Sequence, residues 1–496
     1  MKKIIMNTKY LWLLLIALGL TTACSNDDDS SNGSAPLPPL TSGEANFSTY
    51  VSLGNSLTSG FSDGTVFLAA QQNSFPKILS EQFSLVGGGN FTQPLVNDNF
   101  GGLALAGNRI ANPRLVTIGG GPLPLEAVIG AVTVTTDIAL NNPVGPFNNM
   151  GVPGARSFHL LAPGYGNIAN FPAAANPYFI RMTGTTPDAS VLELSMAQAP
   201  TFFSLWIGNN DVLGYATTGG DGTSPITDQP TFDFAISTLI STLTSQGAKG
   251  VVANIPYVTD IAHFTTVPHN PVPLDAATAG AVNQAYAQYN GGLQLALGGG
   301  FITADEAAAR TIMFEESETN AVVIEDESLT DLSALGLPSI RQATADDLFV
   351  LPAASFIGTE AVPGNPLTVN GVAVPLADKW VLLPSEQDEI RAAVDSFNAT
   401  IQAAVNQAGL AFVDANALLS ELNSTGIASG SFILTSELVT GGMFSLDGVH
   451  LTSRGYAVAA NEFMKAIDAT YGSNFEASGN LVDVGQYPTN YSPTLQ

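Results

Sequence analysis

Cysteine, histidine and basic residues are scarce in this 496-residue chain. Its single cysteine, Cys24, excludes an intramolecular disulfide. Lysine and arginine total 15 against 42 aspartates and glutamates, so the net charge is −27 and a broad basic surface for nucleic acid is excluded. The four histidines and the one cysteine show no zinc-ligand spacing. We therefore expect no nucleic-acid partner, no metal and no other cofactor.

Charged residues of both signs make up only 11% of the chain, whereas 45% of its residues are hydrophobic. A chain of this length and composition can bury a sizeable core, and this composition disfavours bulk disorder. The length allows one large domain or two ordinary ones. No repeat at solenoid spacing is found in the sequence.

Residues 1–23 are typical of a lipoprotein signal peptide. Three lysines precede an apolar run at 11–20, which is too short to span a bilayer as a stable helix. The tetrapeptide at 21–24, Thr-Thr-Ala-Cys, resembles a lipobox, where the chain is cleaved before a cysteine that carries acyl chains. Thr21 departs from the usual pattern, which has leucine there. We expect a lipid anchor on Cys24 that holds the protein to a membrane; the alternative is an ordinary signal peptide.

Residues 24–44 are predicted to form a flexible linker, because they are acidic and rich in serine, asparagine, glycine and proline. Within them, Ser25 to Asp29 (Ser-Asn-Asp-Asp-Asp) resembles the acidic tag that sends Bacteroidetes lipoproteins to the outer face of the outer membrane. We therefore expect the protein in the cell envelope, anchored to the outer membrane. A plain linker is the other interpretation, and periplasmic or surface orientation stays open.

Short apolar runs beyond residue 45 predict buried parallel strands. They lie at residues 48–53, 201–207, 250–255 and 410–413. Apolar residues recur at helical spacing in two segments between them, 232–243 and 390–405. Alternating strands and helices favour an α/β fold with a parallel sheet and right-handed crossovers.

Two long stretches do not fit a minimal α/β domain. Residues 87–147 are rich in glycine, proline and asparagine, and residues 263–382 show little regular pattern. We interpret them as large insertions in one domain that covers residues 45–480 and is followed by a tail, 481–496. The acidic run Glu315 to Glu327 lacks the oxygen spacing of a calcium loop, which favours a solvated face.

A serine follows the first predicted strand in the segment Gly54 to Gly60 (Gly-Asn-Ser-Leu-Thr-Ser-Gly). A strand-to-helix turn there exposes the Ser56 hydroxyl at the carboxyl edge of the sheet. It also places Ser56 at a helix N-terminus, where free backbone N–H groups can bind an oxyanion. Taken alone, the segment also fits a tight turn with a capping serine.

Three further segments indicate a catalytic site only when they are taken together. The glycine-rich segment 149–157 allows a backbone N–H to approach a bound group closely, and 208–211 ends a predicted strand in Gly-Asn-Asn-Asp. Each alone also fits a surface turn. Asp447 and His450 stand three positions apart, and His450 is the only histidine with an acid so placed. An aspartate there can hold one imidazole nitrogen and leave the other free to accept a serine proton.

In this order, the four segments resemble the sequence blocks of the SGNH/GDSL hydrolases, a family of serine esterases and lipases. The resemblance implies a flavodoxin-like three-layer α/β/α fold. It implies that Ser56 is the nucleophile and that Asp447 and His450 complete the triad. It also implies an oxyanion hole formed by the Ser56 N–H, the Gly154 N–H and the Asn210 amide. Gly151 is a rival to Gly154, and Asn209 stands beside Asn210.

The resemblance covers roughly residues 46–80, 148–260 and 385–470. Asn55 departs from it, because the motif that names the family has aspartate there. The implied activity is hydrolysis of a carboxylic ester through an acyl-enzyme, with a lipid, a small ester or an O-acetylated glycan as substrate. The alternative is a surface-exposed lipoprotein that binds glycans or a protein partner on a hydrolase scaffold.

Overall fold

The computed structural model describes residues 36–495. The chain divides into two units, residues 1–39 and 40–496. The predicted signal peptide, Cys24 and the acidic tag lie outside the described residues. Every helix and strand named below belongs to the second unit.

A five-stranded parallel sheet forms the centre of this unit. Its strands are β1 (Tyr50–Gly54), β6 (Asn149–Gly151), β7 (Phe202–Trp206), β8 (Lys249–Ala253) and β15 (Ala411–Val413). Across the sheet they run β15-β8-β7-β1-β6. Counted along the chain, this is the order 2-1-3-4-5 of flavodoxin-like sheets, in which the winding direction reverses at the first strand. The predicted α/β fold with a parallel sheet is confirmed.

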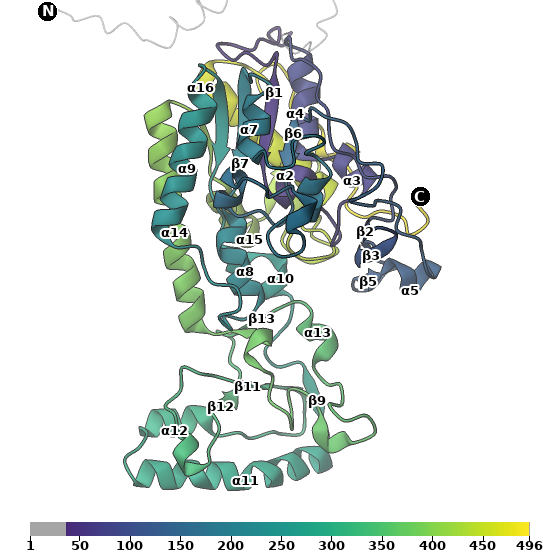
Figure 1. Cartoon of the computed structure of the whole chain (residues 1–496). Coiled ribbons are helices and arrows are strands. Elements are labelled where there is room, and N and C mark those ends of the chain that lie inside the picture. Colours follow the sequence, from purple (N-terminus) through teal and green to yellow (C-terminus); the bar gives the residue numbers. More distant parts are fainter. Residues whose placement is uncertain (1–35, 496) are drawn as a thin grey trace, which may run out of the picture. The chain divides into compact units, whose positions relative to one another are not determined.

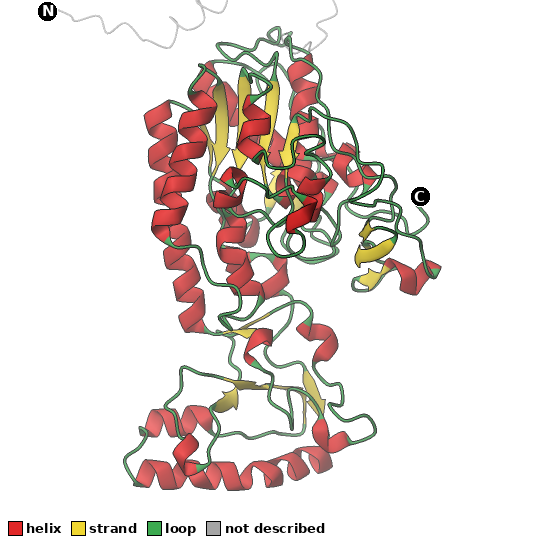
Figure 2. Ribbon diagram, in the orientation of Figure 1, coloured by secondary structure: helices red, strands yellow, loops and turns green. Residues whose placement is uncertain are grey.

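Helices cover both faces of the sheet and complete a three-layer arrangement (Figures 1 and 2). One face carries α4 (Phe75–Ser84) and α16 (Ser453–Tyr471), which pack against each other. The other face carries α7 (Val191–Met196), α9 (Gln229–Thr244) and α14 (Pro384–Ala408). The rings of Phe232 and Phe397 stack 3.9 Å apart and hold α9 on α14.

The strands form where the sequence has apolar runs because both faces of the sheet are covered. Val51, Leu53, Phe203, Leu205 and Val251 are 0% exposed. Burying one such side chain contributes about 1.5–3 kcal/mol, so these short strands gain their stability from packing more than from length.

One strand of the sheet was not predicted. β6 belongs to the glycine-rich segment 149–157, which has no apolar run and fits a loop. Its three residues become a strand because they pair with β1, with Ser52 opposite Asn149 and Gly54 opposite Gly151. Tertiary pairing therefore overrides a weak local preference here.

The insertion at 87–147 holds two small hairpins and a short helix. These are β2 (Leu103–Leu105) with β3 (Asn108–Ala111), β4 (Leu115–Val116) with β5 (Leu123–Pro124), and α5 (Leu125–Ile129). The insertion at 263–382 holds two longer helices and three two-stranded pairs. These are α11 (Ala276–Gly298), α12 (Ala304–Arg310), β9 (Val272–Leu274) with β10 (Ser317–Asn320), β11 (Val323–Glu325) with β12 (Ile340–Gln342), and β13 (Leu348–Phe349) with β14 (Val381–Leu382).

Residues 263–382 show little regular pattern in the sequence, yet α11 alone has 23 residues. Its buried positions alternate three and four apart. They are Ala279, Val282, Tyr286, Tyr289, Leu293 and Ala296. The pattern is faint in the sequence because two of these positions are alanine and two are tyrosine, and because glycines interrupt the helix. Among residues 36–495, no helix is long and apolar enough to cross a membrane.

Candidate active site

Ser56 lies at the sharp turn between β1 and the short helix α2 (Ser56–Ser59). Asn55 caps this helix, because its side-chain oxygen accepts the Leu57 N–H at 3.0 Å. An amide oxygen thus performs the capping that a carboxylate would perform, which accounts for asparagine at this position. Within the described part of the chain, no hydrogen bond is found for the Ser56 N–H. The turn therefore presents a hydroxyl and a free backbone donor side by side.

The turn requires glycine at its start. A Cβ on Gly54 would lie 2.1 Å from the Thr58 hydroxyl and 2.4 Å from the Trp206 carbonyl oxygen. Only a residue without a side chain lets β7 and α2 approach β1 so closely.

His450 connects Ser56 to Asp447. Its Nε2 lies 2.8 Å from Ser56 Oγ, and its Nδ1 lies 2.9 Å from Asp447 Oδ2. All of these atoms come from the carboxyl edge of the sheet: Ser56 follows β1, and the loop with Asp447 and His450 leads into α16. With Nδ1–H donated to Asp447, the Nε2 lone pair faces the serine hydroxyl. The structure thus brings together the three residues predicted as a triad.

Asp447 is held as an anion. Burial alone would raise its pKa, but the charge and hydrogen bond of His450 and the backbone N–H donors outweigh burial and keep the pKa well below its usual range. Those donors are Val449 N–H at 2.9 Å and His450 N–H at 2.8 Å. Gly64 N–H adds a third bond at 2.9 Å. Asp447 therefore stays a hydrogen-bond acceptor for His450 at neutral pH.

A second buried carboxyl group, that of Asp63, holds the same loop. Asp63 is 1% exposed, and its Oδ1 accepts the Leu446 N–H at 3.1 Å. Its own N–H donates to Ser445 Oγ at 3.0 Å, and Ser445 Oγ donates to Asp447 Oδ1 at 3.1 Å. Burial raises the pKa of Asp63 to about 7, and the negative charge of Asp447 adds to this. The sequence analysis missed Asp63, whose one signal was the Asp-Gly turn pair at 63–64.

The structure separates the two candidate glycines. Gly151 is a strand residue of β6 and its N–H donates to Asn149 Oδ1 at 3.0 Å. Gly154 follows the strand with φ +80°, and no hydrogen bond to its N–H is found among residues 36–495. Gly154 thus keeps a free donor, whereas the donor of Gly151 is already used.

The two candidate asparagines open helix α8 (Asn209–Thr217), directly after β7. Asn210 Nδ2 donates one hydrogen to the Ala155 carbonyl at 2.9 Å, which ties its amide to the residue after Gly154. Asn209 Oδ1 accepts a hydrogen bond from Asn55 Nδ2 at 3.3 Å. Both side chains line the cavity beside Ser56. The bond to Ala155 favours Asn210 as the partner of Gly154, while Asn209 supports the turn at Asn55.

Asp211 fastens the glycine segment to α8. Its two carboxylate oxygens accept the Ser157 N–H and the Ser157 hydroxyl, both at 2.8 Å, and its side chain is fully buried. Burial raises the pKa of this carboxyl, and the bonds from Ser157 oppose that rise. The segments after β6 and β7 are thereby held together at the point where the sheet reverses its winding, the usual place for a site in such sheets.

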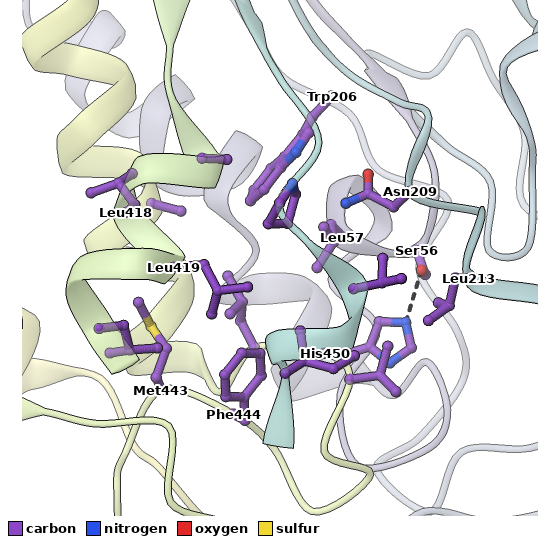
Figure 3. Close-up of a pocket in the computed structure, with 18 of the residues that line it drawn as sticks. Ser56, Leu57, Trp206, Asn209, Leu213, Leu418, Leu419, Met443, Phe444 and His450 are labelled. Atoms are coloured by element: carbon purple, nitrogen blue, oxygen red, sulfur yellow. Dashed lines mark hydrogen bonds between the residues drawn. The ribbon is translucent and has the colours of Figure 1, made fainter. Parts of the chain in front are cut away.

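A cavity of about 840 Å³, including its open mouth, adjoins Ser56 (Figure 3). Polar residues line its end at Ser56: Asn55, Ser56, Asn209, Asn210 and His450. Leu418, Leu419 and Met443 lie across the cavity from Ser56 and His450 (Figure 3). The site therefore joins a polar end with hydrogen-bond donors to an apolar interior.

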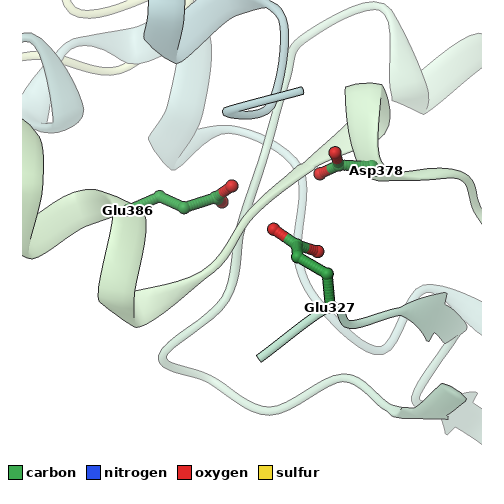
Figure 4. A group of neighbouring side chains, drawn as sticks. All are labelled: Glu327, Asp378 and Glu386. Carbon is green, nitrogen blue, oxygen red and sulfur yellow. The ribbon is translucent and has the colours of Figure 1, made fainter. Parts of the chain in front are cut away.

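A group of three carboxylates lies elsewhere, in the insertion and at the start of α14 (Figure 4). Oxygens of Glu327, Asp378 and Glu386 all lie within 4.8 Å of one another. Burial, and then the neighbouring carboxylates, raise the pKa of both Asp378 and Glu386. Such oxygens are ligands of the kind that hard cations prefer. None of the three lines the cavity beside Ser56, and the absence of a cofactor stays a prediction.

No protein-family model matches this chain, and no curated protein matches it. Among solved structures it is similar to an extracellular lipase from Streptomyces rimosus, with 13% sequence identity and a TM-score of 0.28. The match covers 85% of this chain and 98% of the lipase.

Proposed function

We propose that the protein hydrolyses carboxylic esters, with Ser56 as the nucleophile. The observation that carries this proposal is the continuous hydrogen-bond chain from Ser56 through His450 to Asp447, with contacts of 2.8 and 2.9 Å. Nucleophile, base and orienting carboxylate are thus within hydrogen-bond reach, and both Ser56 and His450 line the cavity.

In the first half of the reaction, His450 Nε2 accepts the Ser56 proton while Oγ attacks the ester carbonyl carbon. The carbonyl electron pair moves onto oxygen, and this oxyanion is bound by the Ser56 N–H, the Gly154 N–H and the Asn210 amide. His450 then gives its proton to the leaving alkoxide, which departs as an alcohol and leaves the acyl group on Ser56.

In the second half, water takes the place of the alcohol. His450 accepts a proton from this water as its oxygen attacks the acyl carbon. The bond to Ser56 Oγ breaks, Oγ recovers the proton from His450, and the carboxylic acid leaves. Throughout, the anionic Asp447 holds the Nδ1–H and stabilises the imidazolium that forms transiently.

Covalent labelling with a fluorophosphonate tests this proposal. The wild-type protein should label, and Ser56→Ala should not. Ser59→Ala is the matched control, since Ser59 lies on the same short helix and is also buried. Its Oγ only donates to the Ser56 carbonyl, so this variant should still label. Undiminished labelling of Ser56→Ala would contradict the nucleophile. An unlabelled wild type would favour the scaffold that binds glycans or partners.

We also propose that the enzyme is a lipoprotein held to the outer membrane by acyl chains on Cys24. The support is the resemblance of residues 21–24 to a lipobox and of residues 25–29 to an acidic export tag. An anchored esterase would meet its substrates at the cell envelope.

A further inference from the structure

The walls of the cavity beside Ser56 differ sharply in polarity from its catalytic end. One wall is α15 (Ala415–Ser424), which contributes Ala415, Leu418, Leu419 and Leu422. The facing wall is the loop that carries the triad aspartate and histidine, and it contributes Met443, Phe444, Val449 and Leu451. Among the described residues that line the cavity, the only titratable side chain is His450.

These walls are set within the molecule and do not form an open face. Leu422, Phe444 and Leu451 are only 2%, 5% and 8% exposed, although each lines the cavity. Trp206, at the end of β7, is 7% exposed. Its indole N–H donates to the Asn254 carbonyl, so it presents an apolar ring to the cavity. An aliphatic chain that lies along these walls contacts mainly hydrocarbon.

This lining discriminates between classes of ester. The hydroxyl groups of a sugar would enter without hydrogen-bond partners beyond the Ser56 end, and each such burial is unfavourable. An acetyl group would reach only the catalytic end and leave the apolar walls uncovered. An aliphatic chain has no polar group to satisfy and gains from every methylene that it removes from water.

We propose that this cavity binds the aliphatic acyl chain of the substrate, so that the enzyme prefers esters of fatty acids to acetate esters. The inference rests on the proposed ester hydrolysis at Ser56. The chain belongs to the acyl side because that side stays bonded to Ser56 Oγ, and Ser56 lines the cavity together with Leu57 and Asn209. The alcohol leaves after His450 protonates it, so it does not have to stay against these walls.

Two ester series test the inference. The first keeps the p-nitrophenyl leaving group and lengthens the acyl chain from acetate to octanoate. We expect kcat/KM to rise about two- to fourfold per methylene, which over the six added methylenes amounts to about 60-fold or more. The second keeps the acetyl group and lengthens the alcohol from ethyl to octyl, with little expected change. A flat first series, or a rise in the second series only, overturns the acyl assignment.

A pair of variants on one helix locates the chain. Leu418→Trp fills part of the cavity, and the half-buried position of Leu418 leaves the fold room to accept it. We expect kcat/KM for octanoate to fall about tenfold or more, with acetate nearly unchanged. Ala417→Trp is the control, because Ala417 is exposed on the same helix and does not line the cavity. Equal losses for both esters in Leu418→Trp, or equal effects of both variants, contradict the proposal.

Fluorophosphonate labelling shows whether a negative result rejects the acyl cavity alone or the esterase activity as well. Normal labelling and acetate hydrolysis without a chain-length preference reject the acyl cavity and leave the esterase intact. Absence of both labelling and hydrolysis rejects the esterase, and the acyl cavity with it.

Discussion

The carboxylate of Asp63 accepts the backbone N–H of Leu446 at 3.1 Å, across 383 positions of the chain. Asp63 has φ +52°, a left-handed conformation that non-glycine residues adopt rarely and at some energetic cost. The next residue, Gly64, donates its N–H to Asp447. The turn that follows α2 thus holds the loop that carries His450, so Ser56 and His450 are positioned by a common support.

Asp63→Ala should lower activity through this support, because it leaves the Leu446 N–H buried without an acceptor. We expect kcat to fall about tenfold or more with KM little changed, since the triad geometry alone is disturbed. Asp63→Asn keeps an acceptor oxygen and should restore most of kcat. Steady-state kinetics with one ester measure both variants. Equal kcat values for the alanine variant and the wild type would remove Asp63 from the positioning of the loop.

Asp63 should also make stability depend on pH. Its pKa is raised by burial to about 7 in the folded protein. A carboxyl with a raised folded-state pKa favours folding while it is protonated, and this stability is lost as pH rises from about 4 through about 7. Asp63→Asn stays neutral, so its unfolding free energy should exceed that of the wild type at pH 8, by on the order of 1–4 kcal/mol.

Denaturant unfolding of both proteins at pH 5 and pH 8 measures this difference. The gain of Asp63→Asn should be larger at pH 8 than at pH 5. The same difference at both pH values would mean that Asp63 does not titrate in this range.

Removing the Asn210 amide should affect the transition state more than the ground state. An oxyanion donor binds the tetrahedral intermediate better than the ester carbonyl, so Asn210→Ala should lower kcat by on the order of 10²–10³ with KM nearly unchanged. Asn209→Ala is measured in parallel, together with the melting temperature. Because Asn209 accepts from Asn55, we expect it to lower thermal stability more than turnover. A large kcat loss in Asn209→Ala alone would assign the donor to Asn209.

The proposed anchor can be tested apart from the enzyme's chemistry. Cys24→Ala should remove the acylation site and release the protein from the membrane fraction, with its ester hydrolysis unchanged. Cell fractionation and metabolic labelling with a fatty-acid probe measure the two properties. Membrane association that persists in the variant, together with an unlabelled wild type, would contradict the lipobox.

Apolar runs in the sequence were enough to locate β1, β7, β8 and β15, because a strand covered on both faces needs hydrophobic residues at nearly every position. Runs with helical spacing located α9 and α14 for the same reason. The residue types and order of the four polar segments were enough to name Ser56, Asp447 and His450 as candidates. Each of these features can be read from residues that lie close together in the sequence.

Tertiary structure alone decided which distant groups meet. Ser56 and His450 stand 394 positions apart, and they lie 2.8 Å from each other because both follow elements at one edge of the sheet. The same packing makes β6 a strand and engages the Gly151 N–H while leaving that of Gly154 free. It places Asp63 against the loop that carries Asp447 and His450. It also sets α15 opposite Met443 to form the apolar cavity. Most of these contacts join residues that are far apart in the sequence. They depend on how the strands and loops pack together, which cannot be read from any one segment.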